Sequence, residues 1–314
     1  MKERLFKLVL AVLLAVCPLQ TLRAQDLVPR AYTITPVHSN AVILTYSFYD
    51  GGILFNNVLP VTDASATIHI SVFSYYHSLS FFGRSANITA SLPYGVGNFR
   101  GTFLDTETKL YRSGLLDTSF RFSVNLKGGP AMSAKDMQTW QQKTLIGLSL
   151  KVIAPTGQYD GTKLINNGTN RWSFKPELGI SRRWGHWVFD AYGAVWFFTT
   201  NPEYWSNNSF YAGTRSQSQK PIGALEGHLS YDVKPRLWLS LDANTWFGGS
   251  ISLNGIENPN TLQVSSLVGA SASIPLSKHQ SLKIGYNNSD YIRYGGSYGN
   301  VSVAWQYSWI GRPN

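Results

Sequence analysis

The sequence predicts an all-β protein, a transmembrane antiparallel β-barrel of about twelve strands. Two observations carry this prediction. From about residue 40 onward, apolar and polar residues alternate along successive stretches, as in strands whose two faces meet different surroundings. The connections between these stretches are alternately tight and long. Short periplasmic turns and long extracellular loops are typical of outer-membrane barrels.

The tight connections are expected at 83–84, 184–185, 234–235 and 276–278. The connections on either side of them are expected to be loops of about 8–20 residues, rich in Gly, Asn, Ser and Tyr. A soluble β-sandwich has no reason to place its long loops on every second connection. The connection pattern therefore favours a barrel over a sandwich.

The first 24 residues have the features of a secretory signal peptide. Lys2, Arg4 and Lys7 form a basic start, residues 8–16 are an unbroken apolar run, and Ala24 is a small residue suited to cleavage. The apolar run is far shorter than the about 20 residues that a membrane-spanning helix needs. We therefore expect export and removal of residues 1–24.

A lipoprotein signal at Cys17 is the alternative, but the neighbouring Val16 and Pro18 disfavour it. Cys17 is the only cysteine, so the exported chain has none. An exported chain of this size without disulfides needs another source of stability. A closed, hydrogen-bonded barrel would supply it.

The basic charge of the chain is spread out. The formal charge is +10; the signal peptide carries four basic residues and one acidic residue, so +7 remains after cleavage. Basic residues are scattered, with only Arg182 and Arg183 forming a notable cluster, which disfavours nucleic-acid binding. We expect attraction to outer-membrane lipid and lipopolysaccharide, or to anionic solutes.

The exported chain is predicted to be one unit. Residues 25–39 form a Pro-containing, extended lead-in that either hangs in the periplasm or enters the barrel mouth. Residues 40–314 form the barrel. Residues 134–140, in the long connection on the turn side, are predicted to form a short amphipathic helix at the periplasmic rim.

Several stretches separate their faces cleanly. Phe120, Phe122, Val124 and Leu126 point one way, and the polar residues between them point the other. The same separation is predicted in 146–152, 189–197, 225–233, 237–243 and 301–309. A Lys or Arg at the midplane of the lipid face costs about 2–4 kcal/mol, so the polar face should line a lumen.

One stretch breaks this pattern. Between residues 67 and 82 the alternation changes phase near Phe73–Tyr75. A β-bulge or burial on both faces is expected there.

Charged residues on the predicted inner face form a candidate selectivity site. Neighbouring strands lie about 4.8 Å apart, so side chains from successive strands can form a ladder of charges across the wall. The alternative is an ion-pair network that only stiffens the barrel. The predicted ladder consists of Arg121, Lys151, Lys175, Glu177, Asp190, Glu226, His228, Asp232 and Asp242.

His228 and Ser230 share the inner face of one predicted strand. Outer-membrane phospholipases also use a His-x-Ser pair on a strand, and such a pair would need a third group to orient the histidine. Phospholipases place this pair on the lipid side, whereas here it shares its face with Glu226 and Asp232. Lumen lining is therefore favoured over catalysis.

The segment 201–219 is predicted to be an aromatic extracellular loop. Tyr204, Trp205, Phe210 and Tyr211 either capture a hydrophobic solute or pack loop against loop over the barrel mouth.

The sequence indicates neither a nucleotide site nor a metal site. A glycine-rich nucleotide loop needs a following helix within a βαβ unit, and the segment with Gly95, Gly97 and Gly101 has neither. These glycines therefore indicate an extracellular loop. The six histidines show no metal-ligand spacing, so neither a metal nor a cofactor is expected.

A resemblance to a known family runs through segments 29–41, 92–101, 150–159, 174–179 and 196–201. Its most specific part is the Pro-Thr-Gly-Gln-Tyr element at 155–159. In these segments the sequence resembles the outer-membrane transporter family named for the meta pathway of phenol degradation. The resemblance implies an outer-membrane transporter for aromatic or other hydrophobic compounds.

The function expected from all of this is passive transport across the bacterial outer membrane, without enzymatic activity. About twelve strands enclose a lumen between the filled interior of eight strands and the open channel of sixteen. The solute should therefore be small, and the resemblance makes it hydrophobic or aromatic. A lipid-acting enzyme using His228 and Ser230, and a structural or adhesive barrel, are the alternatives.

Overall fold

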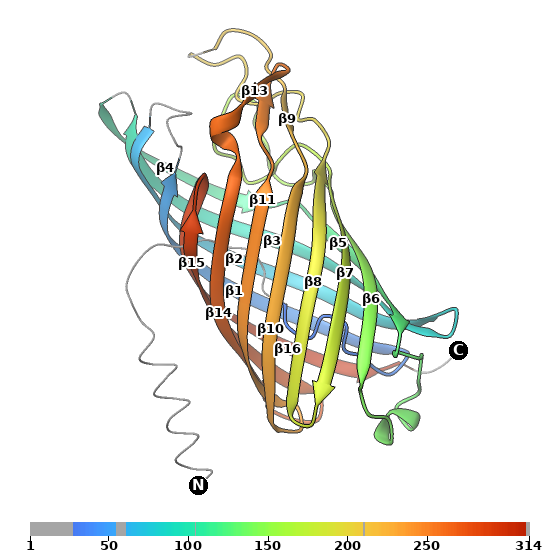
Figure 1. The fold of residues 1–314 in the computed structure, drawn as a ribbon. Coiled ribbons are helices and arrows are strands. Elements are labelled where there is room, and N and C mark those ends of the chain that lie inside the picture. Colours follow the sequence, from blue (N-terminus) through green and yellow to red (C-terminus); the bar gives the residue numbers. More distant parts are fainter. Residues whose placement is uncertain (1–27, 55–60, 104, 210, 312–314) are drawn as a thin grey trace.

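A computed structural model describes residues 28–54, 61–103, 105–209 and 211–311; the predicted signal peptide lies outside these ranges. Thirteen antiparallel strands form one continuous sheet that closes on itself (Figure 1). They are β1 (Ser39–Leu54), β2 (Val61–Phe81), β3 (Arg84–Phe103), β4 (Thr106–Leu115), β5 (Ser119–Lys127), β6 (Thr144–Ile153), β7 (Ser173–Trp184), β8 (Trp187–Phe198), β10 (Ile222–Lys234), β11 (Leu237–Gly248), β14 (Gln263–Pro275), β15 (Gln280–Ile292) and β16 (Gly295–Ile310).

The barrel has twelve strands around its wall. β4 and β5 pair one after the other with the same partner, β3, so these two of the thirteen strands form one interrupted strand. The sheet closes because β1 pairs with both β2 and β16. The predicted all-β antiparallel barrel of about twelve strands is confirmed.

The predicted tight turns lie together at one end of the barrel. They join β2 to β3, β7 to β8, β10 to β11 and β14 to β15. Gly83 and Gly185 lie in the first two of these turns with φ of 74° and 56°, values that a residue without a Cβ adopts readily.

The predicted amphipathic helix at 134–140 is wrong. Only the 3-10 helix η1 (Asp136–Gln138) forms, and none of its residues is buried. Ser133 and Asp136 hydrogen-bond to one another and stabilise this single turn. No helix in the described part of the chain is long and apolar enough to cross a membrane.

At the opposite end, residues 154–172 and 199–216 form long loops, and a small sheet lies among the loops. Its three strands are β9 (Gln217–Gln219), β12 (Ile251–Leu253) and β13 (Ile256–Asn258); residues 259–261 form the 3-10 helix η2 (Pro259–Thr261). Two connections at this end are nevertheless tight, from β3 to β4 and from β15 to β16. The expectation of a long loop at each of them is wrong.

The glycines at 95, 97 and 101 explain why a long loop was wrongly expected between β3 and β4. They lie within β3, which pairs with β2 on one side and β4 on the other, and do not form a loop. Gly97 leaves room for a neighbouring side chain, because a Cβ there would lie 2.6 Å from the Phe99 ring. Glycine at these positions thus allows close packing within a strand.

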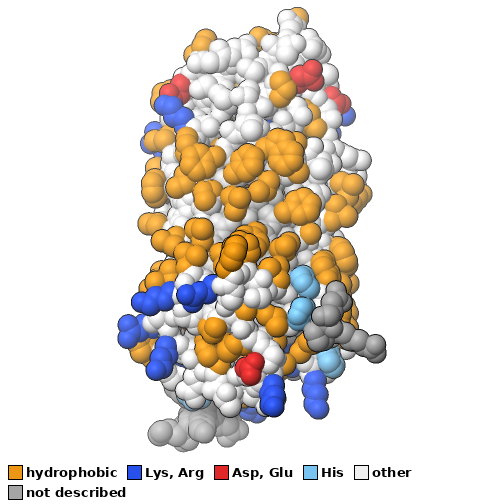
Figure 2. Space-filling view, turned by 90° about the vertical axis from the view of Figure 1, so that its right-hand side faces the viewer, with side chains coloured by type: hydrophobic (Ala, Val, Ile, Leu, Met, Phe, Trp, Pro, Cys, Tyr) orange, Lys and Arg blue, Asp and Glu red, His pale blue; other side chains and the backbone are white. Residues whose placement is uncertain are grey.

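Large apolar side chains cover the outside of the barrel. Leu225, Leu241 and Phe247 are 54%, 62% and 52% exposed, whereas inward neighbours such as Glu226 and Asp242 are buried. On the face shown in Figure 2, hydrophobic side chains form a band over the middle of the molecule, with Lys, Arg, Asp and Glu above and below it. This inverted distribution fits a wall surrounded by lipid.

The bulge expected near Phe73–Tyr75 is wrong. Phe73 and Tyr75 point outward and Ser74 is buried, so β2 alternates regularly through this region. The register shift of β2 lies instead between Thr62 and Ser65. A run of aromatic residues hid the alternation because tyrosine is accepted on both faces of the wall.

Candidate functional site: the barrel lumen

The described part of the lead-in, residues 28–38, lies inside the barrel. The backbone N–H of Arg30 donates to Oδ2 of Asp190 (3.1 Å), and that of Ala31 donates to the hydroxyl of Tyr192 (3.0 Å). Both acceptors are on β8. These contacts place the lead-in within the lumen rather than outside the barrel.

Tyr32 is the most closely held residue of the lead-in, with only 1% of its surface exposed. Its ring fits against Gly147 of β6 and Gly179 of β7, which pair directly with one another. A Cβ at either glycine would lie 2.0–2.1 Å from the ring. The Tyr32 hydroxyl donates to Oε1 of Glu177 (2.9 Å).

Arg30 makes a second attachment near the turn end of the barrel. Its Nη1 lies 2.6 Å from Oδ1 of Asp232, which also pairs with Arg183. Its guanidinium carbon lies 4.8 Å from the centre of the Trp238 ring. Asp190 and Asp232, two members of the predicted ladder, therefore hold the lead-in.

Six other members of the predicted ladder form one connected network across the wall. Nη2 of Arg121 lies 3.3 Å from Oε1 of Glu177, whose Oε2 lies 2.9 Å from Nζ of Lys175. Nζ of Lys175 also lies 2.8 Å from Oε1 of Glu226. The network continues through His228 and ends at Asp242 on β11.

His228 is oriented by a buried carboxylate. Its Nδ1 lies 2.8 Å from Oδ1 of Asp242, and Asp242 also accepts hydrogen bonds from Ser240 and Ser271. The Nε2 atom of His228 lies 3.8 Å from Oε2 of Glu226. His228 is therefore a member of the charge network.

Ser230 does not hydrogen-bond to His228, although a catalytic pair would require it. Its hydroxyl donates to Oγ of Ser240 (3.4 Å). Among the described residues, Nε2 of His228 has no hydrogen-bond partner. Both side chains are buried in the lumen and away from the lipid.

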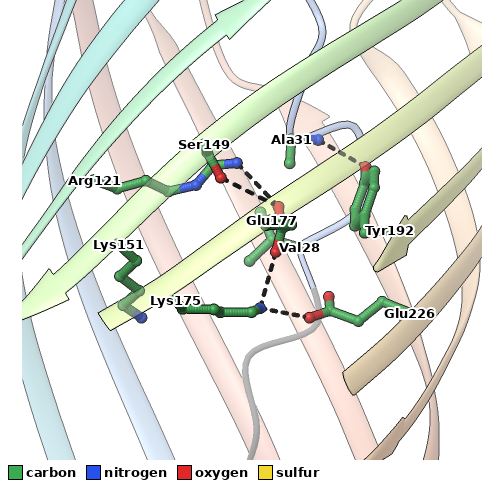
Figure 3. Close-up of a pocket in the computed structure, with 9 residues that line it drawn as sticks. All are labelled: Val28, Ala31, Arg121, Ser149, Lys151, Lys175, Glu177, Tyr192 and Glu226. Carbon is green, nitrogen blue, oxygen red and sulfur yellow. Dashed lines mark hydrogen bonds and ion pairs between the residues drawn. The ribbon is translucent and has the colours of Figure 1, made fainter. Parts of the chain in front are cut away.

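A cavity of about 90 Å³ lies beside the network, in contact with the lead-in (Figure 3). Arg121 lies directly opposite Lys151 on the neighbouring strand, and Lys151 lies directly opposite Lys175 on the next. The lining residues are Val28, Ala31, Arg121, Ser149, Lys151, Lys175, Glu177, Tyr192 and Glu226.

An apolar layer lines the lumen nearer the loop end. Trp246 and Leu267 are 2% and 0% exposed and pack with Ile222 and Ala224. Ala194, Trp196, Phe198 and Ile292 pack against this cluster. The sequence does not predict this layer, because inward tryptophans cannot be distinguished by residue type from those at the membrane interface.

The aromatic side chains of the extracellular loop gather around one arginine. The guanidinium carbon of Arg215 lies 5.7 Å, 4.9 Å and 4.7 Å from the ring centres of Tyr204, Trp205 and Tyr211. Burial raises the pKa of Tyr204 to about 12. Phe210, the fourth aromatic residue predicted here, lies outside the described residues.

The Pro-Thr-Gly-Gln-Tyr element joins two loops to the wall. The N–H of Gly157 donates to Oδ1 of Asp117, in the break between β4 and β5 (2.9 Å). Asn201 of the next loop donates to the Tyr159 hydroxyl (2.8 Å), which itself donates to the carbonyl of Glu203 (2.8 Å). This element therefore fixes the loop end of the barrel.

Comparisons with known proteins agree with this geometry. Residues 51–304 match the family described as "Putative MetA-pathway of phenol degradation". A comparison with curated proteins found no match.

The fold is similar to that of solved structures. The COG4313 outer membrane channel from Pseudomonas putida F1 is 14% identical, with a TM-score of 0.73 over 90% of this chain and 100% of that one. The β domain of the Bordetella autotransporter BrkA is 13% identical, with a TM-score of 0.50 over 87% and 100%. With its apolar outer surface, the chain is a β-barrel of the bacterial outer membrane. The family match over most of its length shows that it belongs to the phenol-degradation MetA-pathway family.

Proposed function

We propose that this protein is a passive outer-membrane channel for small hydrophobic or aromatic solutes. The observation that carries the proposal is the buried aromatic layer of Trp196, Phe198 and Trp246, which lines the lumen of a barrel whose outer face is already apolar. Such a layer inside the wall offers an apolar solute a path separated from both water and lipopolysaccharide.

The lead-in limits the passage. The cavity beside it measures about 90 Å³, whereas an apolar cavity of about 150 Å³ is known to hold benzene. An aromatic ring therefore passes this level only when the lead-in shifts. Residues 28–38 are held by hydrogen bonds and ion pairs, which can exchange with water.

Uptake by whole cells tests the proposal, because apolar solutes cross protein-free phospholipid vesicles unaided. Initial uptake of radiolabelled phenol should be higher in Gram-negative cells that express the protein than in cells that do not. Trp196→Ala and Trp246→Ala should lower this difference at least twofold. The matched control is Trp187→Ala, because Trp187 is 47% exposed on the outer surface. Equal uptake with and without the protein would contradict the proposal.

The aromatic loop is proposed to cover the mouth. Arg215 already lies against the faces of three of its rings, which favours packing over solute capture. Replacing residues 202–216 with a short Gly-Ser linker distinguishes the two roles. A covering loop predicts equal or faster phenol uptake, whereas a capturing loop predicts slower uptake.

We also propose that the protein does not act on lipid. Ser230 hydrogen-bonds to Ser240 and lies on the lumen side of the wall, so neither its base nor its substrate is within reach. Phospholipid release by the purified protein should stay at background and should not change in Ser230→Ala. Release that the variant abolishes would restore the enzyme hypothesis.

A further inference from the structure

Exposed positive charge gathers at the turn end of the barrel. Every connection at this end carries an exposed Lys or Arg, either in the turn or in the strand end beside it. The long connection from β5 to β6 carries three of them. On the tight turns, the exposed cations include Arg84 beside the β2–β3 turn, Arg182 before the β7–β8 turn, Arg236 in the β10–β11 turn and Lys278 in the β14–β15 turn.

Few carboxylates oppose this charge. Of the described residues at the turn end, Asp136 is the one exposed carboxylate, and its Oδ2 accepts a hydrogen bond from Ser133. Asp232 is less exposed and pairs with Arg30 and Arg183. The exposed cations are therefore without a carboxylate partner in the part of the chain that the structure describes, and an anion from outside the protein can approach them.

At the loop end, by contrast, exposed cations lie beside carboxylates. Nζ of Lys109 lies 3.1 Å from Oε1 of Glu107, and Nζ of Lys220 lies 2.6 Å from Oε2 of Glu257. The short turns of outer-membrane barrels face the periplasm. The unpaired charge therefore faces the phospholipid leaflet of the membrane and lies far from the lipopolysaccharide leaflet.

Exposed apolar side chains accompany the cations of the turn end. Trp184 is 50% exposed, and the guanidinium carbon of Arg182 lies 5.2 Å from the centre of its ring. Phe82 is 91% exposed and lies two residues from Arg84. On the face shown in Figure 2, Lys and Arg side chains predominate at the lower, turn end, next to the hydrophobic band. Exposed tryptophans mark the headgroup level of a bilayer, so these cations lie at the level of lipid phosphates.

The cations surround the whole rim. The connections that carry them join β2 to β3, β5 to β6, β7 to β8, β10 to β11 and β14 to β15, which follow one another around the closed sheet. A soluble acidic protein would contact one side of such a rim, whereas a lipid leaflet contacts every side. The distribution of charge therefore favours lipid headgroups as the partner.

We propose that the turn end binds the phosphate groups of anionic phospholipid, such as phosphatidylglycerol, in the periplasmic leaflet. The barrel then keeps a ring of this lipid around its rim. Basic residues next to a membrane attract anionic headgroups over roughly one Debye length, about 10 Å at 0.1 M salt. This inference concerns the surroundings of the barrel and does not depend on solute transport.

Spin-labelled lipids test the proposal in the folded, full-length protein. In phosphatidylcholine vesicles that contain the protein, the fraction of each label that the protein immobilises gives its relative association. Spin-labelled phosphatidylglycerol should associate at least about threefold more strongly than spin-labelled phosphatidylcholine. The ratio should approach one in 1 M salt, where the Debye length is about 3 Å.

Two variants locate the lipid-binding charge. The turn-end variant should lose most of the preference for phosphatidylglycerol, and it combines Lys127→Gln, Arg182→Gln, Lys234→Gln and Lys278→Gln. The loop-end control removes the same charge from residues that are also exposed. It should keep the preference, and it combines Arg100→Gln, Lys109→Gln, Lys163→Gln and Lys220→Gln.

Heat-modifiable gel migration checks that both variants are folded. An unaltered protein with no preference for phosphatidylglycerol, which is the result that an acidic soluble partner predicts, would overturn the proposal. A preference that survives in the folded turn-end variant, or that falls equally in the two variants, would also overturn it.

Discussion

The hydroxyl of Tyr32 donates a 2.9 Å hydrogen bond to Oε1 of Glu177, the same carboxylate oxygen that lies 3.3 Å from Nη2 of Arg121. One carboxylate therefore joins the lead-in to the charge network of the wall. A change in the position of the lead-in alters the surroundings of this network, and a change in the network alters the hold on the lead-in. Removing the Tyr32 side chain, or displacing its ring from Gly179, should therefore release the lead-in from the wall.

Tyr32→Ala should release the lead-in and widen the lumen. Glu177 keeps Arg121 and Lys175 as partners, so the barrel should still fold. Single-channel conductance in planar bilayers should rise at least twofold. Tyr32→Phe loses only a hydrogen bond worth about 0.5–1.5 kcal/mol and should have a smaller effect. Identical conductance in wild type and Tyr32→Ala would show that the lead-in does not limit the passage.

Gly179→Ala, a substitution in the wall, should also release the lead-in and widen the lumen. The added Cβ would lie 2.1 Å from the Tyr32 ring and so must displace it. Conductance should rise as in Tyr32→Ala, and the double variant should show no further increase, because both changes remove one contact. Gly227→Ala is the control, since nothing lies within 4 Å of a Cβ at that position. Additive increases in the double variant would contradict this account.

The strands and most of the charge network could be predicted from the sequence. Lipid favours apolar side chains and the lumen favours polar ones, so the alternation of residue types along a strand such as β11 predicts which side chains point inward. The alternation predicts Asp242 and Leu241 on opposite faces, and the structure places them so.

The lead-in could not be placed in this way, because residues 28–38 have no periodicity and the wall residues that hydrogen-bond to Arg30, Ala31 and Tyr32 lie 93 to 202 residues away along the chain. A signal was nevertheless present in the wall. Gly147 and Gly179 are inward glycines on neighbouring strands in direct register, and together they leave space for one large ring. Paired inward glycines therefore indicate that something from outside the wall packs there.

His228→Ala should destabilise the barrel. The substitution removes the imidazole that contacts Asp242, whose side chain is 1% exposed, although the hydroxyls of Ser240 and Ser271 remain as its partners. Losing one partner of a buried polar group costs about 1–3 kcal/mol. Urea unfolding in lipid vesicles, followed by heat-modifiable migration, measures this change. Ser230→Ala is the neighbouring control and should have a smaller effect, since its hydroxyl makes one long hydrogen bond. Equal losses in the two variants would argue against a special role for His228.

Raising the pH should loosen the aromatic loop. Burial holds the pKa of Tyr204 at about 12, whereas a tyrosine in an opened loop ionises near its ordinary value of about 10. The closed loop keeps the proton that the open loop loses, so its stability is fully present below pH about 10 and falls as the pH rises toward 12. The difference in absorbance at 295 nm between wild type and Tyr204→Phe should titrate well above pH 10. A midpoint near 10 would show that water reaches this hydroxyl.

Arginine substitutions on two exposed residues test where the membrane lies. Leu241 is 62% exposed in the middle of β11, and Ile256 is 78% exposed on β13 among the loops. In water both would be tolerated, because neither side chain packs closely. In a bilayer, Leu241→Arg should cost about 2–4 kcal/mol in the free energy of unfolding, whereas Ile256→Arg should cost less than about 1 kcal/mol, because an arginine on the lipid face is costly only near the midplane. Urea titration of both variants folded into lipid vesicles gives the two values. Because the side chains of Leu241 and Ile256 are both largely exposed, a difference in cost comes from their surroundings. Equal costs would mean that Leu241 does not face hydrocarbon.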